Sequence, residues 1–383
     1  MLSTRALNRA LLARQGLLDR LTLHLPEALE QLVGLQAQVP NAPYYGLWTR
    51  LQRFAIDDLA ELLVTRQAVR MVLMRSTVHL VTARDALFLR PLVAPMLERQ
   101  LFTGSPWGRA LEGIDIEALV ATGRGLLEQE PRTNPELARF LVARFPGRDG
   151  ESMAQGLRNL LPLVQLPPRG IWGVGGVPTL TTVESWIGAP VSADATPDAL
   201  VIRYLAAFGP ASVKDAQTWC GLTRLGAVFE RLRPELLAFR DEQGRELFDL
   251  PDAPRPDPAT PAPPRFLPEY DNALVSHADR TRIIAPEHRE RVFTKGTVLL
   301  DGFVRGTWKL TARRRTATLA IDPFRRLSKR DQTGLRREGE RLLAFAAPEG
   351  ASCEVILPAS GEHPEKVARA GSPGAIRRGR SSW

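Results

Sequence analysis

Residues 69–82 of the chain read VRMVLMRSTVHLVT, a run of apolar and β-branched side chains that predicts a narrow β-ribbon. Before it, helices are predicted over 4–14, 26–35 and 43–53. A fourth helix is predicted to begin at Asp57, because an acidic first turn suits the helix dipole. Short helices followed by a small β-ribbon are the element order of a winged helix, so the first part of the chain is predicted to be one.

The same order recurs twice further along the chain. After a helix over 83–100 that tolerates two prolines, the second unit is predicted to contain helices over 115–129, 133–145 and 151–161 and a glycine-rich hairpin over 167–176, which would form a second wing. The third unit is predicted to contain helices over 197–208, 213–220 and 223–232 and a strand pair that turns at 242–244. Three units of one order indicate a repeated architecture, although their sequences barely resemble each other.

The C-terminal third of the chain differs in composition. Residues 251–264 contain seven prolines and are predicted to be a stiff linker or a surface crossing. Strand-like runs over 297–303, 306–311 and 316–321, a basic helix over 325–345 and a strand over 353–357 predict an antiparallel β unit. Residues 359–383 are rich in Gly, Ser, Pro and Arg and are predicted to be a disordered tail.

The predicted fold class is therefore α+β, with three tandem winged-helix modules in a predominantly helical chain and a C-terminal antiparallel β unit. The expected divisions are a first module over 1–110, a second over 111–190, a third over 191–250, a Pro-rich linker over 251–264, the β unit with its basic helix over 265–358 and the tail over 359–383.

Composition narrows the class of function. The chain has 383 residues and a net charge of +9, which suits a polyanionic partner such as nucleic acid, although a generally Arg-rich proteome would give the same excess. Its two cysteines, Cys220 and Cys353, argue against a disulfide framework and a cysteine zinc site. With no apolar run near 18 residues and no secretory signal expected at the N-terminus, a reducing cytoplasm is predicted.

The familiar enzyme motifs are missing from the sequence, which has no Walker loop, no nucleotide fingerprint and no zincin motif. The feature that remains is Gln36-Ala37-Gln38, where a helix gives way to a Pro-rich turn. If this segment is extended, both glutamine side chains point to the same side, because strand side chains alternate. Spacing alone leaves a plain alternative, in which both glutamines are simply solvated.

Several blocks of sequence resemble the AlkZ-like branch of the AlkZ/YcaQ winged-helix DNA glycosylases. They are VGLQAQ (33–38), YGLWTRL (45–51), RSTVHL (75–80), LPEYDN (267–272), DG (301–302) and GTW (306–308). The family has three tandem winged helices and a C-terminal β unit, and it removes alkylated bases from duplex DNA. Its catalytic Gln-apolar-Gln signature would fall on Gln36 and Gln38. The YcaQ-like branch carries Asp at the second position, so Gln38 indicates the AlkZ-like branch.

This resemblance implies a chemistry that two amides can perform. Glutamine cannot take a proton at pH 7, but its carbonyl oxygen can orient a water toward C1′ and stabilise positive charge on the sugar. Such assistance suffices for a base alkylated at N7 or N3, which is cationic and departs neutral. We therefore expect a glycosylase without a cofactor or metal. We expect it to be monofunctional, because no lysine near the motif could form a Schiff base for a lyase step. The likeness to AlkZ extends the expected substrates to bulky adducts or interstrand crosslinks from a genotoxic natural product, with a role in self-resistance.

The expected partner is double-stranded DNA with alkylated purines, bound by a monomer associated with the nucleoid and not with a membrane. Candidate DNA contacts are Arg75, Thr77, Arg169, Trp172, Arg313, Arg314, Arg325 and Arg326. Each arginine could equally be a solvated surface residue, and Trp172 could be a core residue. His79 and His277 lie in or near these blocks and are interpreted as structural. The alternative function is a winged-helix transcription regulator without catalysis, which would need a dimer interface and a sequence-reading helix.

Overall fold

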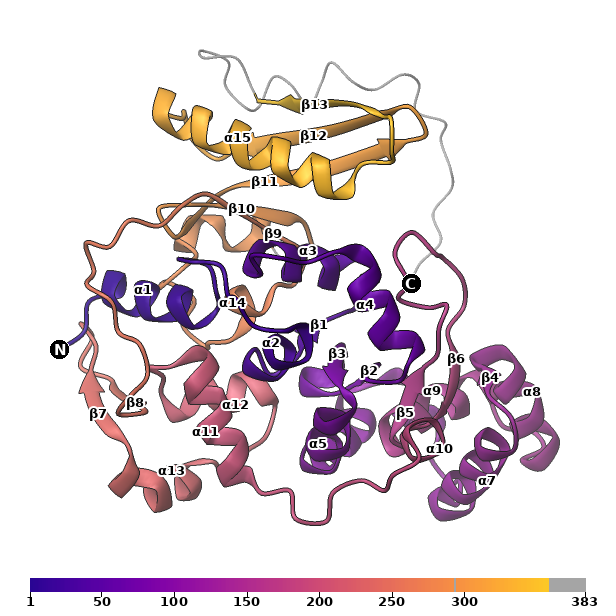
Figure 1. Ribbon diagram of the computed structural model, residues 1–383. Coiled ribbons are helices and arrows are strands. Elements are labelled where there is room, and N and C mark those ends of the chain that lie inside the picture. Colours follow the sequence, from indigo (N-terminus) through magenta and orange to yellow (C-terminus); the bar gives the residue numbers. More distant parts are fainter. Residues whose placement is uncertain (293, 358–383) are drawn as a thin grey trace.

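The computed structural model describes residues 1–292 and 294–357 (Figure 1). The predicted disordered tail over 359–383 lies outside the described residues. The chain is a mixed α/β protein in which helices surround two larger sheets and a separate strand pair. Within the described residues, no helix is both long and apolar enough to span a bilayer.

The first part of the chain contains the helices and the β-ribbon that were predicted. Its elements are α1 (Thr4–Arg14), α2 (Leu25–Gln31), β1 (Leu35–Gln36), α3 (Ala42–Arg50), α4 (Ile56–Val64), β2 (Ala68–Val72), η1 (Met74–Ser76) and β3 (Val78–Thr82). The acidic start of α4 is confirmed, since the Asp58 carboxylate accepts the backbone N–H of Ala55 at 2.8 Å. Residues 69–82 form two antiparallel strands joined by a tight turn, with Val72 paired to Val78.

Two helix ends in this region were predicted wrongly. The helix predicted over 43–53 ends at Arg50, because Leu51 is extended. The helix expected to reach Leu35 ends at Gln31, because Val33 and Gly34 adopt positive φ values of 53° and 77° and terminate it. Leu35 then begins β1, which pairs with β3. A Cβ added at Gly34 would lie 2.5 Å from Val81 Cγ1 and 2.8 Å from the Leu80 carbonyl oxygen, so glycine permits this close approach.

Strands of the first and second parts of the chain join in one six-stranded sheet. Its order is β1-β3-β2-β5-β6-β4, where β4 is Arg132–Thr133, β5 is Leu163–Gln165 and β6 is Thr179–Thr182. The junction is the antiparallel pairing of β2 with β5, in which Arg70 lies opposite Gln165 and Met71 opposite Val164. All pairs in this sheet are antiparallel.

The second part of the chain packs around its own apolar core. Its helices are α5 (Ala83–Gly104), α6 (Pro106–Ala110), α7 (Ile116–Gln129), α8 (Asn134–Arg144), α9 (Gly150–Leu160) and α10 (Val183–Ile187). Helix α5 contains both predicted prolines and contributes Leu101 to that core, whereas its other buried apolar residues and Val183 of α10 belong to the larger core of the first part. The glycine-rich run 167–176 is not a strand pair as expected but the loop that joins β5 to β6. Gly170, Gly173 and Gly176 have φ values of 96°, 71° and 122°, which a strand cannot adopt.

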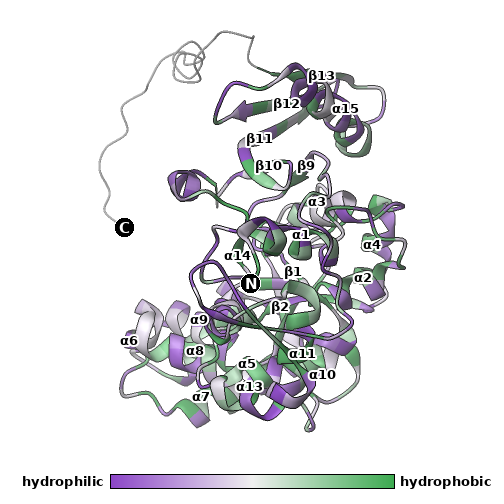
Figure 2. Cartoon of the chain, turned by 90° about the vertical axis from the view of Figure 1, so that its left-hand side faces the viewer, coloured by the Kyte–Doolittle hydropathy of each residue, from purple (hydrophilic) through white to green (hydrophobic). Residues whose placement is uncertain are grey.

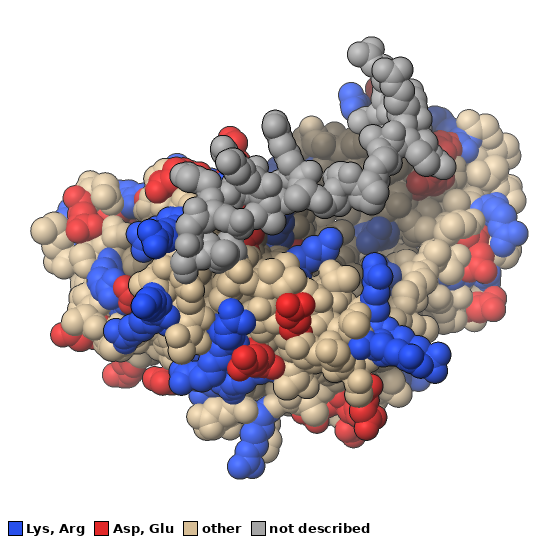
Figure 3. All heavy atoms as spheres, turned by 90° about the horizontal axis from the view of Figure 1, so that it is seen from above, with Lys and Arg blue, Asp and Glu red and all other residues tan. Residues whose placement is uncertain are grey.

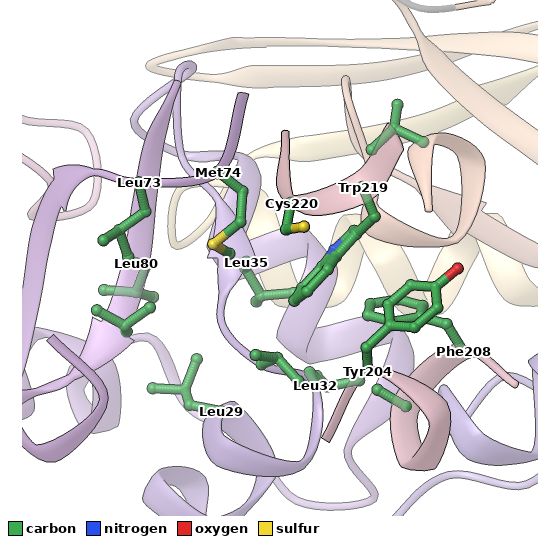
Figure 4. Packing of buried hydrophobic residues seen from close by; sticks show 14 of the residues in the cluster. Leu29, Leu32, Leu35, Leu73, Met74, Leu80, Tyr204, Phe208, Trp219 and Cys220 are labelled. Carbon is green, nitrogen blue, oxygen red and sulfur yellow. The ribbon is translucent and has the colours of Figure 1, made fainter. Parts of the chain in front are cut away.

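The third part packs into the same core as the first. Its elements are α11 (Pro197–Phe208), α12 (Val213–Cys220), α13 (Gly226–Leu232), η2 (Arg233–Glu235), β7 (Leu237–Arg240) and β8 (Glu246–Asp249). A single bridge joins Ala211 to Phe248 beside the β7–β8 pair. Figure 4 shows Trp219 and Cys220 of α12 beside Leu35 of β1 and Met74 of η1, so the third part covers the segment that carries the glutamines.

The C-terminal part forms a five-stranded sheet covered by a helix. Its elements are β9 (Arg265–Leu267), α14 (Asn272–Val275), η3 (Pro286–Arg291), β10 (Gly296–Leu300), β11 (Phe303–Arg313), β12 (Thr316–Pro323), α15 (Lys329–Ala346) and β13 (Ser352–Ile356). The strand order is β13-β12-β11-β10-β9. The prediction of an antiparallel unit fails at β13, which pairs parallel with β12 because α15 returns the chain across the sheet. Figure 2 shows α15 with β12 and β13 at one end of the molecule.

The proline-rich segment 251–264 is a surface crossing that is bound to α1. Arginines on α1 donate hydrogen bonds to backbone carbonyls of the proline-rich segment, Arg5 to Pro258 at 2.7 Å and Arg9 to Thr260 at 2.6 Å. Arg14 also forms a buried ion pair with Asp249 at 2.7 Å. These contacts fix the path by which the chain passes from β8 to the C-terminal sheet.

Candidate active site

The Gln36-Ala37-Gln38 segment forms the edge of the six-stranded sheet. Gln36 lies opposite His79 of β3, and the Ala37 N–H donates to the Val78 carbonyl at 2.7 Å. Gln36 is therefore the last residue of the extended strand β1, whereas Gln38 lies in the bend that follows it, so the alternation that the sequence analysis assumed does not extend to Gln38. The Ala37 side chain is fully buried in the main core.

Both glutamine carbonyl oxygens accept hydrogen bonds from fixed donors. Arg75 Nη2 donates to Gln36 Oε1 at 3.0 Å, and the Val78 N–H donates to Gln38 Oε1 at 3.2 Å. Neither donor can accept a hydrogen bond, so the chemistry alone requires the carbonyl end of each amide to face it. Gln36 is only 8% exposed, whereas Gln38 is exposed at the surface. Each oxygen keeps a second lone pair for another donor, such as a water.

Arg75 reaches Gln36 from a turn of unusual backbone conformation. Arg75 and Ser76 have φ values of 57° and 56°, in a two-residue turn where glycine or asparagine is the usual choice. Holding a non-glycine residue there costs roughly 1–3 kcal/mol. The guanidinium also donates from Nη1 to the Trp219 carbonyl at 2.6 Å. Burial lowers the pKa of Arg75 to about 10, which leaves it charged at neutral pH.

The backbone of the motif is held by two further side chains. The Asn272 carboxamide accepts the Gln36 N–H at 3.3 Å and donates to the Gly34 carbonyl at 2.6 Å. On the other side, Arg70 Nη2 donates to the Ala37 carbonyl at 2.8 Å. The polar groups of this short edge strand are therefore bonded on both sides, which restrains the two amides.

A buried ion pair positions Asn272. Arg50 of α3 bonds both carboxylate oxygens of Asp271, at 2.8 and 2.6 Å, and both side chains are at most 1% exposed. Asp271 in turn caps α14 by accepting the Ala273 N–H at 2.9 Å. Sequence reasoning did not assign roles to Arg50, Asp271 or Asn272. Their presence in the family-like blocks was the signal that could have found them.

The two buried histidines differ in how they are bonded. His277 contacts the Ser276 hydroxyl and the Phe208 carbonyl, at 2.9 and 3.0 Å, which supports the structural role predicted for it. His79 Nδ1 lies 2.9 Å from the Thr77 carbonyl and must carry the hydrogen, since a carbonyl cannot donate. Its buried Nε2 has no partner among the described residues. Burial, reinforced by the charge of Arg75, lowers the pKa of His79 to about 3, so the ring is neutral.

A pocket of about 540 Å³ opens beside Gln38. Its walls come from the β2–β3 turn, the C-terminal end of α5, helix α6 and helix α9. We call it the Gln38 pocket, and its polar lining includes Ser76, Gln155, Arg158 and Asn159. Gln38, but not Gln36, thus lines a hollow large enough for a small organic ligand, since such pockets measure roughly 300–1,000 Å³.

Four of the predicted DNA contacts lie inside the fold or within a loop. Arg75 is bonded as described, and the Thr77 hydroxyl donates to the Met74 carbonyl at 3.1 Å within the same turn. Arg169 Nη1 donates to the Gly176 carbonyl at 2.9 Å across the β5–β6 loop. Trp172 packs with its ring centroid 5.1 Å from that of Tyr44, which fits the alternative role of a packing residue. The DNA-binding roles of these four residues stay predictions.

The other four predicted contacts lie on the C-terminal sheet. Arg313 and Arg314 are exposed at the β11–β12 turn, and Arg325 and Arg326 are exposed between β12 and α15. Figure 3 views the molecule from this side and shows lysines and arginines interspersed with acidic residues on the visible surface. These arginines lie in a different sheet from the glutamines. In the described part of the chain, no three His, Cys, Asp or Glu side chains gather as a metal site requires.

Comparisons with known proteins agree with this arrangement. A family model described as DNA glycosylase AlkZ-like matches residues 29–345. A curated relative, the interstrand DNA cross-link repair glycosylase of Streptomyces sahachiroi, is 26% identical over an alignment of 341 residues, and the match covers 81% of this chain and 88% of the relative. The solved structure of Streptomyces sahachiroi DNA glycosylase AlkZ superposes with a TM-score of 0.75 at 21% identity, covering 93% of this chain and all of that one.

Proposed function

Because this chain belongs to the AlkZ-like DNA glycosylase family and is a DNA glycosylase, we propose that it is a monofunctional enzyme that removes N7- and N3-alkylated purines from duplex DNA. The observation that carries the proposal is the pair of amides at the end of β1, whose carbonyl oxygens are both oriented by donors. The reaction breaks the N-glycosidic bond and leaves an abasic site.

The two glutamines have different surroundings and therefore different roles in the proposal. Gln38 is exposed, and its carbonyl partner is an uncharged N–H, so its second lone pair can accept a hydrogen from the attacking water. Gln36 is buried against the Arg75 cation, which draws on the electron density of its carbonyl oxygen. We assign Gln38 to orienting the water and Gln36 to holding the edge of the site in place.

In the proposed reaction, the electron pair of the C1′–N bond moves onto the alkylated base, which leaves as a neutral molecule. Positive charge develops on the sugar, where a carbonyl dipole can stabilise it. The oriented water adds to C1′ and releases its proton to solvent, so no side chain needs to act as a strong base. Such a site suits bases that are already good leaving groups, which is why alkylated purines are the proposed substrates.

Two further features of the substrate are proposed from the relative and not from the geometry. The curated relative is named for interstrand cross-link repair. We propose that this chain likewise accepts bulky adducts or interstrand crosslinks of a genotoxic natural product and serves self-resistance. It would act as a monomer on DNA in the cytoplasm, associated with the nucleoid.

Three winged-helix modules, divided as the sequence predicted, are proposed as the DNA-binding framework. The order of elements supports this: helix, strand, two helices and two strands occur in α2-β1-α3-α4-β2-β3 and again in α7-β4-α8-α9-β5-β6. In each case the first strand pairs with the last, as the β1–β3 and β4–β6 pairs do. The third unit repeats the pattern with a single bridge, Ala211 to Phe248, in place of the first strand.

DNA would be held by phosphate contacts from Arg313, Arg314, Arg325 and Arg326, which are exposed and carry no ion pair in the described part of the chain. For about six such contacts the slope of log K against log salt would be near −5. Arg169, on the β5–β6 loop, is proposed as a further contact from that wing.

Release of free N7-methylguanine from methylated duplex DNA tests the proposal. We expect Gln36→Ala and Gln38→Ala each to reduce single-turnover excision strongly while the fold and the DNA affinity stay close to the parent. The matched control is Gln129→Ala, an exposed glutamine at the end of α7, which should excise at the parental rate. Borohydride should trap no covalent complex. Parental rates in both motif variants would contradict the assignment of Gln36 and Gln38.

A further inference from the structure

The Gln38 pocket lies between two parts of the chain that have different sequences and different cores. One wall is formed by Gln38 and by Ser76 of the β2–β3 turn, and another by Gln155, Arg158 and Asn159 of helix α9. Helix α9 occupies the position that reads a DNA groove in many winged helices. Here its polar residues line the hollow beside the motif, where they can meet a ligand of the active site.

Hydrogen bonds connect helix α9 to the other walls of the pocket. Asn159 Nδ2 donates to the Ser76 hydroxyl at 3.3 Å and to the Leu97 carbonyl at 3.0 Å. Arg90, which is buried, donates to the Asn159 and Leu161 carbonyls at 2.6 and 3.0 Å and so fixes the end of α9. The turn that orients Gln36 is therefore coupled to the wall that carries Arg158.

The lining combines apolar side chains with hydrogen-bonding groups. Val72, Val78 and Leu101 are buried at its base, and Trp107 of α6 stands at its edge with 37% of its surface exposed. Helix α6 is held close to α5, because a Cβ at Gly108 would collide with the Leu101 carbonyl. An indole beside amides and a guanidinium suits a planar heterocycle that both stacks and forms hydrogen bonds, which is how extruded bases are bound.

Arg158 is the one cation among the residues that line the pocket, and it lacks an acidic partner. Its Nη1 donates to Gln155 Oε1 at 3.0 Å, and within the described residues no carboxylate lies within ion-pair distance of it. Burial lowers the pKa of Arg158, as expected for a half-buried guanidinium without a counterion. Free donors of this kind call for an acceptor from a ligand.

We propose that the Gln38 pocket receives the alkylated purine, with Trp107 stacking on the ring and Arg158 donating a hydrogen bond to it as it departs. This inference rests on the proposed function. As the glycosidic bond breaks, its electron pair enters the purine, and electron density on the ring oxygen and nitrogens rises. A cation at that position disfavours the positively charged ground state and stabilises the electron-rich leaving group, while Gln38 acts on the sugar side. The volume of about 540 Å³ leaves room for a substituent larger than methyl.

Variants of the two pocket residues test this. We expect Arg158→Met and Trp107→Leu each to slow single-turnover release of N7-methylguanine at least tenfold, with Trp107→Phe restoring most of the rate because it keeps a stacking ring. The matched control is Arg144→Met, an exposed arginine at the end of α8, which should behave as the parent. The affinity of the Arg158→Met and Trp107→Leu variants for a duplex that contains an abasic site should equal that of the parent, because an abasic site has no base to occupy the pocket.

A second measurement does not depend on catalysis. Free N7-methylguanine should inhibit the parent and quench its tryptophan fluorescence, and both effects should be lost in Trp107→Leu and Arg158→Met. If the parent releases no base, the proposed function fails. If the parent is active but the pocket variants match its rate, or if Arg158→Met weakens binding to undamaged and abasic DNA equally, the pocket assignment is wrong and Arg158 is a phosphate contact.

Discussion

Replacing Arg75 distinguishes two roles that the sequence could not separate. As a DNA contact, Arg75 would bind a phosphate, which lysine can also do as a point charge. As a positioning residue, it must span from the Trp219 carbonyl to Gln36 Oε1, at 2.6 and 3.0 Å, with two different guanidinium nitrogens. Lysine has one ammonium group and cannot reproduce that fork. Arg75→Lys should therefore lower excision while it preserves the charge.

The size of the effect follows from the bond that is lost. A hydrogen bond to a charged group contributes about 1.5–3 kcal/mol. If the freed Gln36 side chain no longer holds the edge of the site in place, the rate falls about 10- to 100-fold, since each 1.4 kcal/mol is a factor of ten. The dissociation constant for DNA should stay within about twofold of the parent.

The assay is single-turnover release of N7-methylguanine at saturating enzyme, with binding measured separately over a range of salt. Arg75→Met should leave the slope of log K against log salt unchanged, because no phosphate contact is removed. Arg314→Gln, at the exposed β11–β12 turn, is the contrasting variant. It should reduce that slope by about 0.9 and leave the saturated rate unchanged. A parental rate in Arg75→Lys together with a reduced salt slope in Arg75→Met would refute the positioning role.

Three other predictions concern the support of the site and its chemistry. Asp271→Ala should lower the free energy of unfolding by about 3–5 kcal/mol, because it leaves the Arg50 charge buried and unpaired. Urea titration measures this, and a loss below about 1 kcal/mol would contradict it. His79 stays neutral in the folded state with its pKa near 3, whereas the unfolded chain protonates it below about pH 6.5. The free energy of unfolding should therefore fall between pH 7 and pH 5 by about 2 kcal/mol more in the parent than in His79→Gln. If the two proteins instead lose stability in parallel, the histidine is not buried in its neutral form. Gln38→Asp should keep activity on N7-methylguanine if residue 38 orients water, and its rate should drop as the carboxylate protonates near pH 4. Inactivity at every pH from 4 to 8, in a variant that folds and binds DNA, would exclude that role.

Local pattern was enough to predict the elements that build the framework. The acidic start of α4, the Thr133 cap of α8 and the β-branched run around Val78 each depend on residues close in sequence, and each produced the expected element. The repeated order of helices and strands followed from these local features. The Gln36 and Gln38 assignment came from family-like blocks and not from spacing, because two amides at a helix end have no chemical signature of their own.

Other features could not be predicted because their causes lie far apart in the chain. Strand β1 has only two residues, too few to show an alternating pattern, and it exists because β3 is available as a partner. The sequence predicted Arg75 to be a surface cation. Nothing near it in sequence predicts the positive φ value of this non-glycine residue or the direction of its side chain. Its orientation depends on Trp219, which is 144 residues away.

The sequence by itself determined most of the helices, the ribbon of β2 and β3, and which side chains can bond or stack. Only the tertiary structure decided that β2 pairs with β5, that Asn272 holds Gln36 across 236 residues, and that Arg158 lines the pocket beside Gln38. The physical reason is that propensity, capping and side-chain alternation act over a few residues. A site assembled from separate elements depends on how their surfaces pack, and that is specified only when the whole core forms at once.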